Sequence, residues 1–228
     1  MKNSNEMCLP LRMPFKCSEI DFPATPFAEK PLIHYYTEMI FVREGALRLQ
    51  IEDQDLLLHE GEMGLVCPGL RHFISQADGA SAHLCLLRVD QERIPMNQDQ
   101  LQRVKRVMIQ AWREKRSMVF PVRGSKLEAL SDFCVREDSE KKLCYDLSVA
   151  SGLGLIFTEI IRKWVGEGLA IGACEIQEDP IYSLSSYIQS HLRDGLRVED
   201  LAARCGLSYP WFAKRFREIY GVSCKDYI

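Results

Sequence analysis

The sequence of 228 residues lacks any long run of apolar residues. No stretch approaches the roughly 18 to 20 apolar residues that a membrane helix needs, and the longest candidate, Val149 to Phe157, has half that length. The first residues, MKNSNEMCLP, contain no apolar core of a secretory signal. These two absences argue against a membrane-spanning or secreted protein, so we expect a cytoplasmic protein with no membrane partner.

Paired cysteines and an excess of positive charge are also missing. The nine cysteines are scattered without any CxxC, so the sequence predicts neither a disulfide framework nor a zinc site, and a reducing compartment suits it best. The net charge of −3 gives no overall basic field, so nucleic-acid binding would depend on a local patch. Hydrophobic residues make up 46%, which is enough for a core, and the length suits two modest domains.

The sequence between about residues 31 and 89 predicts a series of short strands. Leu47, Leu49 and Ile51 alternate with polar residues, which is the period of a half-buried strand. Further apolar runs lie at residues 39–42, 56–58, 65–67, 73–74 and 84–89. Turn-forming pairs such as Pro68-Gly69 separate them. Several short strands at close spacing predict a small sandwich or barrel.

From about residue 98 the hydrophobic period becomes helical. We expect one helix up to the break at Pro121, a second over residues 126–136 and a third over residues 140–165. The third carries a seam at alternating four-three spacing, as in a coiled coil. The seam consists of Leu143, Leu147, Ala150, Gly154, Phe157, Ile161 and Trp164. Its partner is either a neighbouring helix of the same chain or the same helix of a second subunit.

The last zone, residues 181–228, contains three short helices separated by glycines. A short helix, a tight turn through Gly206 and a further helix have the layout of a helix-turn-helix. In the final helix Phe212, Phe216 and Ile219 would face inward. The opposite face would then carry Pro210, Ala213, Lys214 and Arg217. A recognition helix needs this combination, because one face packs on its neighbours while the other enters the major groove.

Two segments, residues 196–208 and 211–228, closely resemble the first helix-turn-helix of AraC-family transcriptional regulators. The matching positions are Leu201, Ala202, Gly206, Leu207, Ser208, Phe212, Phe216, Gly221 and Tyr227. In that family the second helix of the unit inserts into the major groove, so the resemblance implies double-stranded DNA as a partner. The resemblance and the face opposite the apolar stripe give the expected DNA-contacting residues, which are Arg204, Ser208, Tyr209, Pro210, Trp211, Ala213, Lys214 and Arg217.

The N-terminal zone is similar to the regulatory domain of that family, a cupin-like β-barrel. Residues 34–38 and 42–45 look like the first cupin motif, and residues 61–64 and 68–72 look like the second. Barrels of this kind often hold one small ligand, which implies a small-molecule effector. The expected ligand-binding residues are His34, Tyr36, Glu38, Arg43 and His72.

Three of these residues, His34, Glu38 and His72, are also the types that a cupin enzyme offers to iron or manganese. Metal cupins usually carry His-x-His, however, and Leu32 stands where the first histidine would be. From the sequence we therefore expect no metal and no cofactor, and a pocket-lining or structural role for the three residues.

Together these features predict a multidomain α+β chain. Residues 1–97 would form the cupin-like effector domain, 98–168 a helical dimerisation region, 169–180 a linker and 181–228 an all-α helix-turn-helix unit. The expected function is that of a homodimeric DNA-binding transcription regulator rather than an enzyme. The alternative is a cupin enzyme or metabolite-binding protein with a helical tail. AraC-type DNA-binding domains contain two helix-turn-helix units, so we expect that a second unit is missing from this chain.

Overall fold

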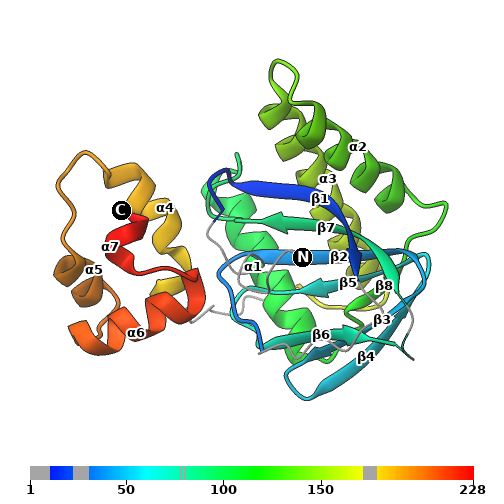
Figure 1. Ribbon diagram of the computed structural model, residues 1–228, viewed down its shortest axis with the longest axis horizontal. Coiled ribbons are helices and arrows are strands. Elements are labelled where there is room, and N and C mark those ends of the chain that lie inside the picture. Colours follow the sequence, from blue (N-terminus) through cyan, green and yellow to red (C-terminus); the bar gives the residue numbers. More distant parts are fainter. Residues whose placement is uncertain (1–10, 23–30, 78, 80, 172–178) are drawn as a thin grey trace.

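A computed structural model describes residues 11–22, 31–77, 79, 81–171 and 179–228. Two antiparallel sheets form the N-terminal part, and a group of short C-terminal helices lies beside them (Figure 1). The strands are β1 (Phe15–Phe22), β2 (Thr37–Glu44), β3 (Ala46–Ile51), β4 (Gln54–His59), β5 (Glu62–Val66), β6 (His72–Gln76), β7 (Ala82–Val89) and β8 (Val119–Pro121). One sheet has the order β1-β7-β2-β5-β8 and the other β4-β3-β6.

The strand pattern follows from the sequence. In β3 the side chains of Leu47, Leu49 and Ile51 are fully buried while those between them are exposed, so the strand has one face on the core. At Gly64 in β5 a Cβ atom would lie only 2.7 Å from side-chain carbons of Leu49 and Leu58. Only glycine therefore allows the two sheets to approach this closely here.

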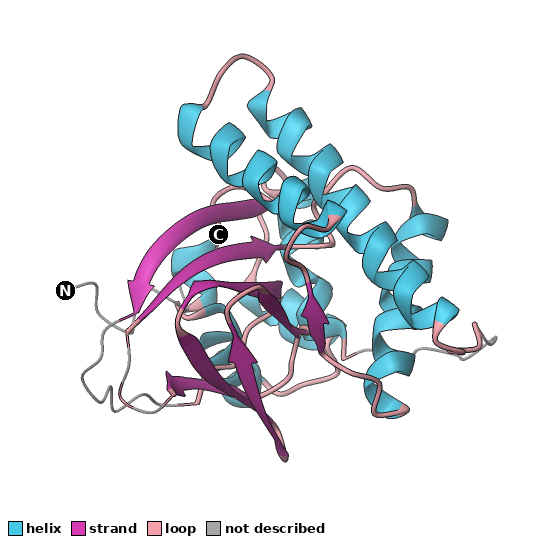
Figure 2. Ribbon diagram, turned by 90° about the vertical axis from the view of Figure 1, so that its right-hand side faces the viewer, coloured by secondary structure: helices cyan, strands magenta, loops and turns pink. Residues whose placement is uncertain are grey.

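Three long helices pack along the sheets (Figure 2). They are α1 (Gln98–Arg113), α2 (Lys126–Glu140) and α3 (Tyr145–Gly166). Helix α1 begins with a capping box, in which the Asn97 side chain accepts from the backbone of Gln100 and the Gln100 side chain accepts from the backbone of Asn97. The sheets and these helices share one hydrophobic core. The domain boundary that the sequence predicts at residue 97 thus divides residues that pack in one continuous core. Strand β8 also belongs to this core.

The predicted start of the third helix at residue 140 is wrong. Lys141 and Cys144 adopt left-handed conformations, with φ of 49° and 64°, and they make a turn that separates α2 from α3. Leu143 lies in this turn and is 96% exposed. It is therefore not part of a helical seam.

The remaining seam residues divide between the core and the surface. Phe157 and Trp164 are buried, whereas Leu147 is 61% exposed. The face that packs on the chain's own core carries Val149, Gly152, Leu153, Ile156, Phe157, Ile160 and Trp164. The buried stripe is thus rotated from the predicted seam, and the first half of that seam faces outward.

The C-terminal part consists of short helices around a second core. They are the 3-10 helix η2 (Pro180–Ser183), α4 (Leu184–His191), α5 (Val198–Arg204), α6 (Tyr209–Tyr220) and α7 (Cys224–Tyr227). Leu11, Tyr35 and Tyr36 from the N-terminal part belong to this second core. Most of the predicted linker, residues 172–178, lies outside the described residues. No helix in the described part of the chain is both long and apolar enough to cross a membrane.

Candidate functional site

Helices α5 and α6 are joined by a tight turn that fixes their relative direction. Gly206 in this turn has φ of +66°, a conformation that favours glycine. The Leu207 amide donates to the Ala202 carbonyl at 3.0 Å, which closes the end of α5. Ser208 then occupies the N-cap position of α6, although its side chain makes no capping hydrogen bond. The layout is that of the predicted helix-turn-helix.

One face of α6 anchors the helix. Phe212, Phe216 and Ile219 are buried, as the sequence predicts, and Tyr220 is buried with them. The rings of Phe216 and Tyr220 are stacked, with centroids 4.1 Å apart. The Tyr220 hydroxyl donates to the Ile181 carbonyl at 2.9 Å and so connects α6 to η2. These contacts hold α6 firmly without using its other face.

The other face of α6 is open to solvent. Ser208, Tyr209, Pro210, Trp211, Lys214 and Arg217 are exposed, and Ala213 is half-buried. The Lys214 ammonium group lies 5.5 Å from the centre of the Trp211 ring. Arg204 is also exposed, at the end of α5, and its guanidinium group lies over the Tyr187 ring at 4.1 Å. The predicted DNA-contacting residues are therefore all accessible, and seven of the eight are on α6 or its N-cap.

The second candidate site is a buried polar cluster in the N-terminal part. His34, Glu38 and His72 are each about 1% exposed. Oε2 of Glu38 lies 3.6 Å from Nε2 of His34 and 3.4 Å from Nε2 of His72. Oε1 of Glu38 accepts a hydrogen bond of 2.7 Å from Nε of Arg88. Three of the five predicted ligand residues thus lie together.

The electrostatics of the cluster follow from burial and from Arg88. Burial lowers the pKa of His34 to about 4, so its imidazole is neutral near pH 7. Burial would raise the pKa of the Glu38 carboxyl, but the positive charge of the Arg88 guanidinium helps to bring this pKa well below its usual range. The cluster therefore contains a carboxylate and at least one neutral imidazole.

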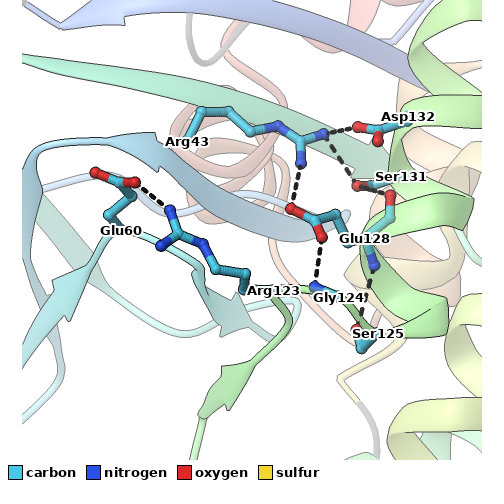
Figure 3. Close-up of polar contacts among 8 residues, drawn as sticks. All are labelled: Arg43, Glu60, Arg123, Gly124, Ser125, Glu128, Ser131 and Asp132. Atoms are coloured by element: carbon cyan, nitrogen blue, oxygen red, sulfur yellow. Dashed lines mark hydrogen bonds and ion pairs between the residues drawn. The ribbon is translucent and has the colours of Figure 1, made fainter.

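Arg43, another predicted ligand residue, points elsewhere (Figure 3). Its guanidinium group forms an ion pair with Asp132 and donates to the Ser131 hydroxyl at 3.2 Å, both in α2. A third α2 residue, Glu128, lies 3.8 Å away. These contacts tie β2 to α2, so the structure gives Arg43 a structural role in place of the predicted ligand contact.

The fifth predicted residue, Tyr36, connects the cluster to the C-terminal helices. Its ring stacks on that of His34, with centroids 3.9 Å apart and planes within 11°. Tyr36 also makes an edge contact with Tyr35 at 5.4 Å. Tyr35 in turn stacks on Tyr220 of α6 at 4.2 Å. A continuous line of aromatic rings therefore runs from the buried cluster to the helix-turn-helix.

A cavity of about 210 Å³ lies at the same junction. Its walls include Tyr35, Cys67, Met108 and Ile109 from the N-terminal part and Tyr182 from η2. None of the five predicted ligand residues is part of its wall. The structure therefore brings His34, Glu38 and His72 together, while the cavity is lined by residues that the sequence did not single out as ligand-binding.

Arg88 and Asp90 are functional candidates that the sequence reasoning missed. Arg88 interrupts the otherwise apolar strand β7, and Asp90 follows directly after the strand. Both are buried. A charged residue inside an apolar run was the available signal, because such a group needs a buried partner. The partner itself, Glu38, is fifty residues away and could not be identified from spacing.

Comparisons with protein families agree with this division of the chain. Residues 17–130, half of the chain, match the model of the AraC-like ligand binding domain. Residues 188–228 match the model of bacterial regulatory helix-turn-helix proteins of the AraC family. These matches confirm the predicted fold, a cupin-like β-rich domain followed by helices and a C-terminal helix-turn-helix. Among curated proteins, no sequence relative was found.

Several solved structures are similar at low identity. Apo ToxT from Vibrio cholerae strain SCE256 is 11% identical with a TM-score of 0.48, over 95% of this chain and 97% of that chain. The unsaturated fatty acid bound wild-type ToxT is 13% identical with a TM-score of 0.49, over 93% and 76%. A putative ethanolamine utilization protein Q from Salmonella typhimurium LT2 is 16% identical with a TM-score of 0.29. In that case the match covers 33% of this chain and 58% of the other.

Proposed function

Because this chain belongs to the AraC family of helix-turn-helix transcription regulators, we propose that it reads operator DNA through the exposed face of α6. The residues proposed to contact DNA are Arg204, Ser208, Tyr209, Pro210, Trp211, Ala213, Lys214 and Arg217. The observation that carries the proposal is the two-sided character of α6. Its aromatic face is buried against the neighbouring helices, so the cations and small residues of the other face are free to enter the major groove of DNA.

The proposed contacts to bases and to phosphates come from different elements. Lys214 and Arg217 lie one helical turn apart on the exposed face, where their side chains can reach base edges or the backbone. Arg204 lies at the end of α5, outside the recognition helix, and is suited to a phosphate contact. The local cations thus compensate for the absence of an overall basic field.

The proposed site of the small-molecule effector is the junction cavity. Its walls come from both parts of the molecule, so a ligand there touches the barrel and η2 at once. Tyr35 forms part of the wall and also stacks on Tyr220, so a ligand can act directly on the position of α6. This proposed site differs from the ligand-binding residues expected from the sequence, of which Arg43 forms an ion pair with α2.

The proposed homodimer forms through a groove between α1 and α3. The groove has a volume of about 630 Å³, and the outward residues Leu147, Ala150, Gly154 and Ile161 of the predicted seam are part of its lining. Leu147 and the neighbouring Leu155 are 61% and 44% exposed, which is unusual for large apolar side chains on one helix face. A second copy of this helix would cover them, and two subunits would read two half-sites.

In functional terms we retain the predicted division of the chain. Residues 1–97 form the effector domain and residues 98–168 contribute the helices of the dimer. Residues 169–180 link these parts to residues 181–228, which bind DNA. The effector and dimer parts act as one body, since they share a core. Membership of a regulator family favours this function over the alternative of a cupin enzyme with a helical tail.

The decisive experiment is a selection of bound duplexes from a random-sequence DNA library, followed by titration of the enriched duplex at two salt concentrations. Replacing Lys214 with alanine should weaken binding by about 1–3 kcal/mol if it contacts a base. If it contacts a phosphate, the slope of log affinity against log salt should fall by about 1. Thermal stability should not change, because this side chain is exposed.

Lys142→Ala is the matched control, since it removes an exposed lysine from the turn between α2 and α3. It should bind the enriched duplex as tightly as the wild type. The assignment of the DNA-reading face is wrong if Lys214→Ala and Lys142→Ala behave alike in both affinity and salt dependence.

A further inference from the structure

The buried cluster holds three polar atoms that have no hydrogen-bond partner. They are Nε2 of His34, Oε2 of Glu38 and Nε2 of His72, and among the described residues nothing donates to or accepts from them. All three atoms lie within 4.8 Å of one another. Unpaired polar atoms of this kind are costly in a protein interior. Their convergence on one point therefore requires an explanation.

The hydrogen bonds of the two imidazoles indicate which ring nitrogen carries the proton. Nδ1 of His34 lies 2.8 Å from the Tyr36 carbonyl oxygen, and Nδ1 of His72 lies 3.2 Å from that of Leu70. A carbonyl oxygen only accepts, so Nδ1 carries the proton in each ring. In a neutral imidazole Nε2 then presents a lone pair toward the Glu38 carboxylate. Three electron-pair donors then face one another, which is unfavourable unless a cation or a hydrogen-bond donor lies between them.

The two spacings between Glu38 and the histidines fit a metal ion as that cation. Nitrogen and oxygen ligands bind Zn²⁺ at about 2.0–2.2 Å, so two ligands at tetrahedral angles lie about 3.4 Å apart. The Nε2 to Oε2 distances of 3.4 and 3.6 Å match this spacing. Both imidazoles donate Nδ1–H to a backbone carbonyl, which is the usual outer support of a histidine ligand. The other Glu38 oxygen is held by Arg88.

Leu32 does not obstruct such a site. Its backbone pairs with that of His72 through two hydrogen bonds of 2.8 and 3.0 Å, so it positions this histidine. Two histidines and one carboxylate suffice for Zn²⁺ or Fe²⁺, with remaining positions open to water or ligand. Because Arg88 already balances the Glu38 charge, an anionic donor such as a carboxylate would suit an open position.

We propose that His34, Glu38 and His72 bind a divalent first-row transition-metal ion inside the β-rich domain. The bound ion fixes the His34 ring, and with it the stacked ring of Tyr36. Tyr36 contacts Tyr35, which stacks on Tyr220 of the DNA-reading helix. The metal therefore steadies the junction between the two parts of the molecule. Only this regulatory consequence rests on the proposed function, since metal binding itself does not require DNA.

The first test measures metal directly. The full chain, stripped with chelator, is incubated separately with Zn²⁺, Fe²⁺, Mn²⁺ and Co²⁺, freed of excess metal and subjected to elemental analysis and thermal melting. We expect about one ion per chain for at least one metal, with a higher Tm because the ion binds only the folded state. No stoichiometric binding of any of the four ions would overturn the proposal and leave a protonated imidazole as the explanation.

Variants locate the ion. Glu38→Gln and, separately, His72→Gln should lower the affinity by at least ~100-fold, since even outer-shell changes cost roughly 10–100-fold. His83→Gln is the matched control, because this histidine lies beside Glu19 and Asp21 at the surface. Unchanged binding in both cluster variants, or loss only in the control, would refute the assignment. If the cluster variants do not fold, histidine NMR of the wild type decides: Zn²⁺ must shift the resonances of His34 and His72.

The regulatory consequence is tested with Tyr35→Leu. This variant should still bind one ion per chain, while the difference in DNA affinity between metal-loaded and metal-free protein should disappear. If the wild type binds the ion but its DNA affinity is independent of metal, the coupling is wrong and the metal site stands. If the wild type binds no DNA library member, the proposed function fails and the metal result is unaffected.

Discussion

Asp90 is a buried acid at the junction between the β-rich part and the C-terminal helices. Its side chain is inaccessible, and Oδ2 has no hydrogen-bond partner among the described residues. The Arg93 guanidinium lies 3.9 Å from this oxygen, and Glu92 is close by in the chain. The groups that interact electrostatically with the carboxyl also include Ser185, Tyr35, Tyr220 and Tyr227. Burial raises the pKa of Asp90 to about 7, despite the opposing influence of the Ser185 hydroxyl and the Arg93 guanidinium.

This raised pKa predicts that stability falls as the pH rises. The protonated acid is favoured in the folded state, so its contribution is complete below the ordinary pKa of 3.8 and is lost as the pH passes through about 7. Asp90→Asn should remove this dependence, and its Tm advantage over the wild type should grow from pH 5 to pH 8. Asp55→Asn, at an exposed ion pair with Arg48, is the control. Parallel Tm curves for wild type and Asp90→Asn would contradict the assignment.

At the scale of single elements, the outward face of α3 makes the most specific prediction. Leu147 and Leu155 are exposed beside the groove, so replacing both with glutamate should give folded monomers in sedimentation experiments. Phe157, although it belongs to the predicted seam, is 2% exposed, and a charge there would disrupt the core instead. Leu57→Glu, on β4 and 40% exposed, is the matched control. A wild-type chain that is monomeric at micromolar concentration would exclude this dimer.

The elements show how far the sequence pattern reaches. Strands with regular alternation, such as β3, and helices with strong periodicity, such as α6, are predicted correctly. Strand β8 was missed because three residues carry no period, and β1 because its apolar residues, Phe15 to Phe22, are interrupted by charges. The α3 seam was misplaced because a repeat of 3.5 drifts relative to a straight helix of 3.6 residues per turn.

The candidate sites were predictable to a similar extent. The proposed DNA-reading face follows from the spacing of apolar and basic residues within one helix. His34, Glu38 and His72 could be grouped from their motifs, and the structure places them together. The partners that give the cluster its character, Arg88 and the ring of Tyr36, depend on strand pairing between β2 and β7 and on side-chain direction. A local pattern does not contain this information.

At the scale of the whole molecule, Tyr35 joins the N-terminal part to the second core. Besides stacking on Tyr220, its hydroxyl accepts a 2.9 Å hydrogen bond from the Leu11 amide. Tyr35→Leu leaves this buried amide unpaired, which costs about 1–3 kcal/mol. We expect calorimetry to show one unfolding transition for the wild type and two for the variant, since the parts then unfold separately. Tyr187→Ala, within the C-terminal helices, is the control: it should lower the Tm while the chain still unfolds in one transition.

The second core, to which both parts of the chain contribute, also limits how the C-terminal helices can be exchanged between regulators. A cut near residue 179 would remove Leu11, Tyr35 and Tyr36 from a DNA-reading unit whose core they complete, and would expose the ring of Tyr220. Gly69 adds a steric condition, because a Cβ there would lie 2.7 Å from the Tyr182 ring. Exchange of the C-terminal helices between related regulators would thus succeed only when Leu11, Tyr35, Tyr36 and Gly69, which contact these helices, are transferred with them. The helix-turn-helix of this protein therefore depends on residues of the N-terminal part and is not an independently transferable unit.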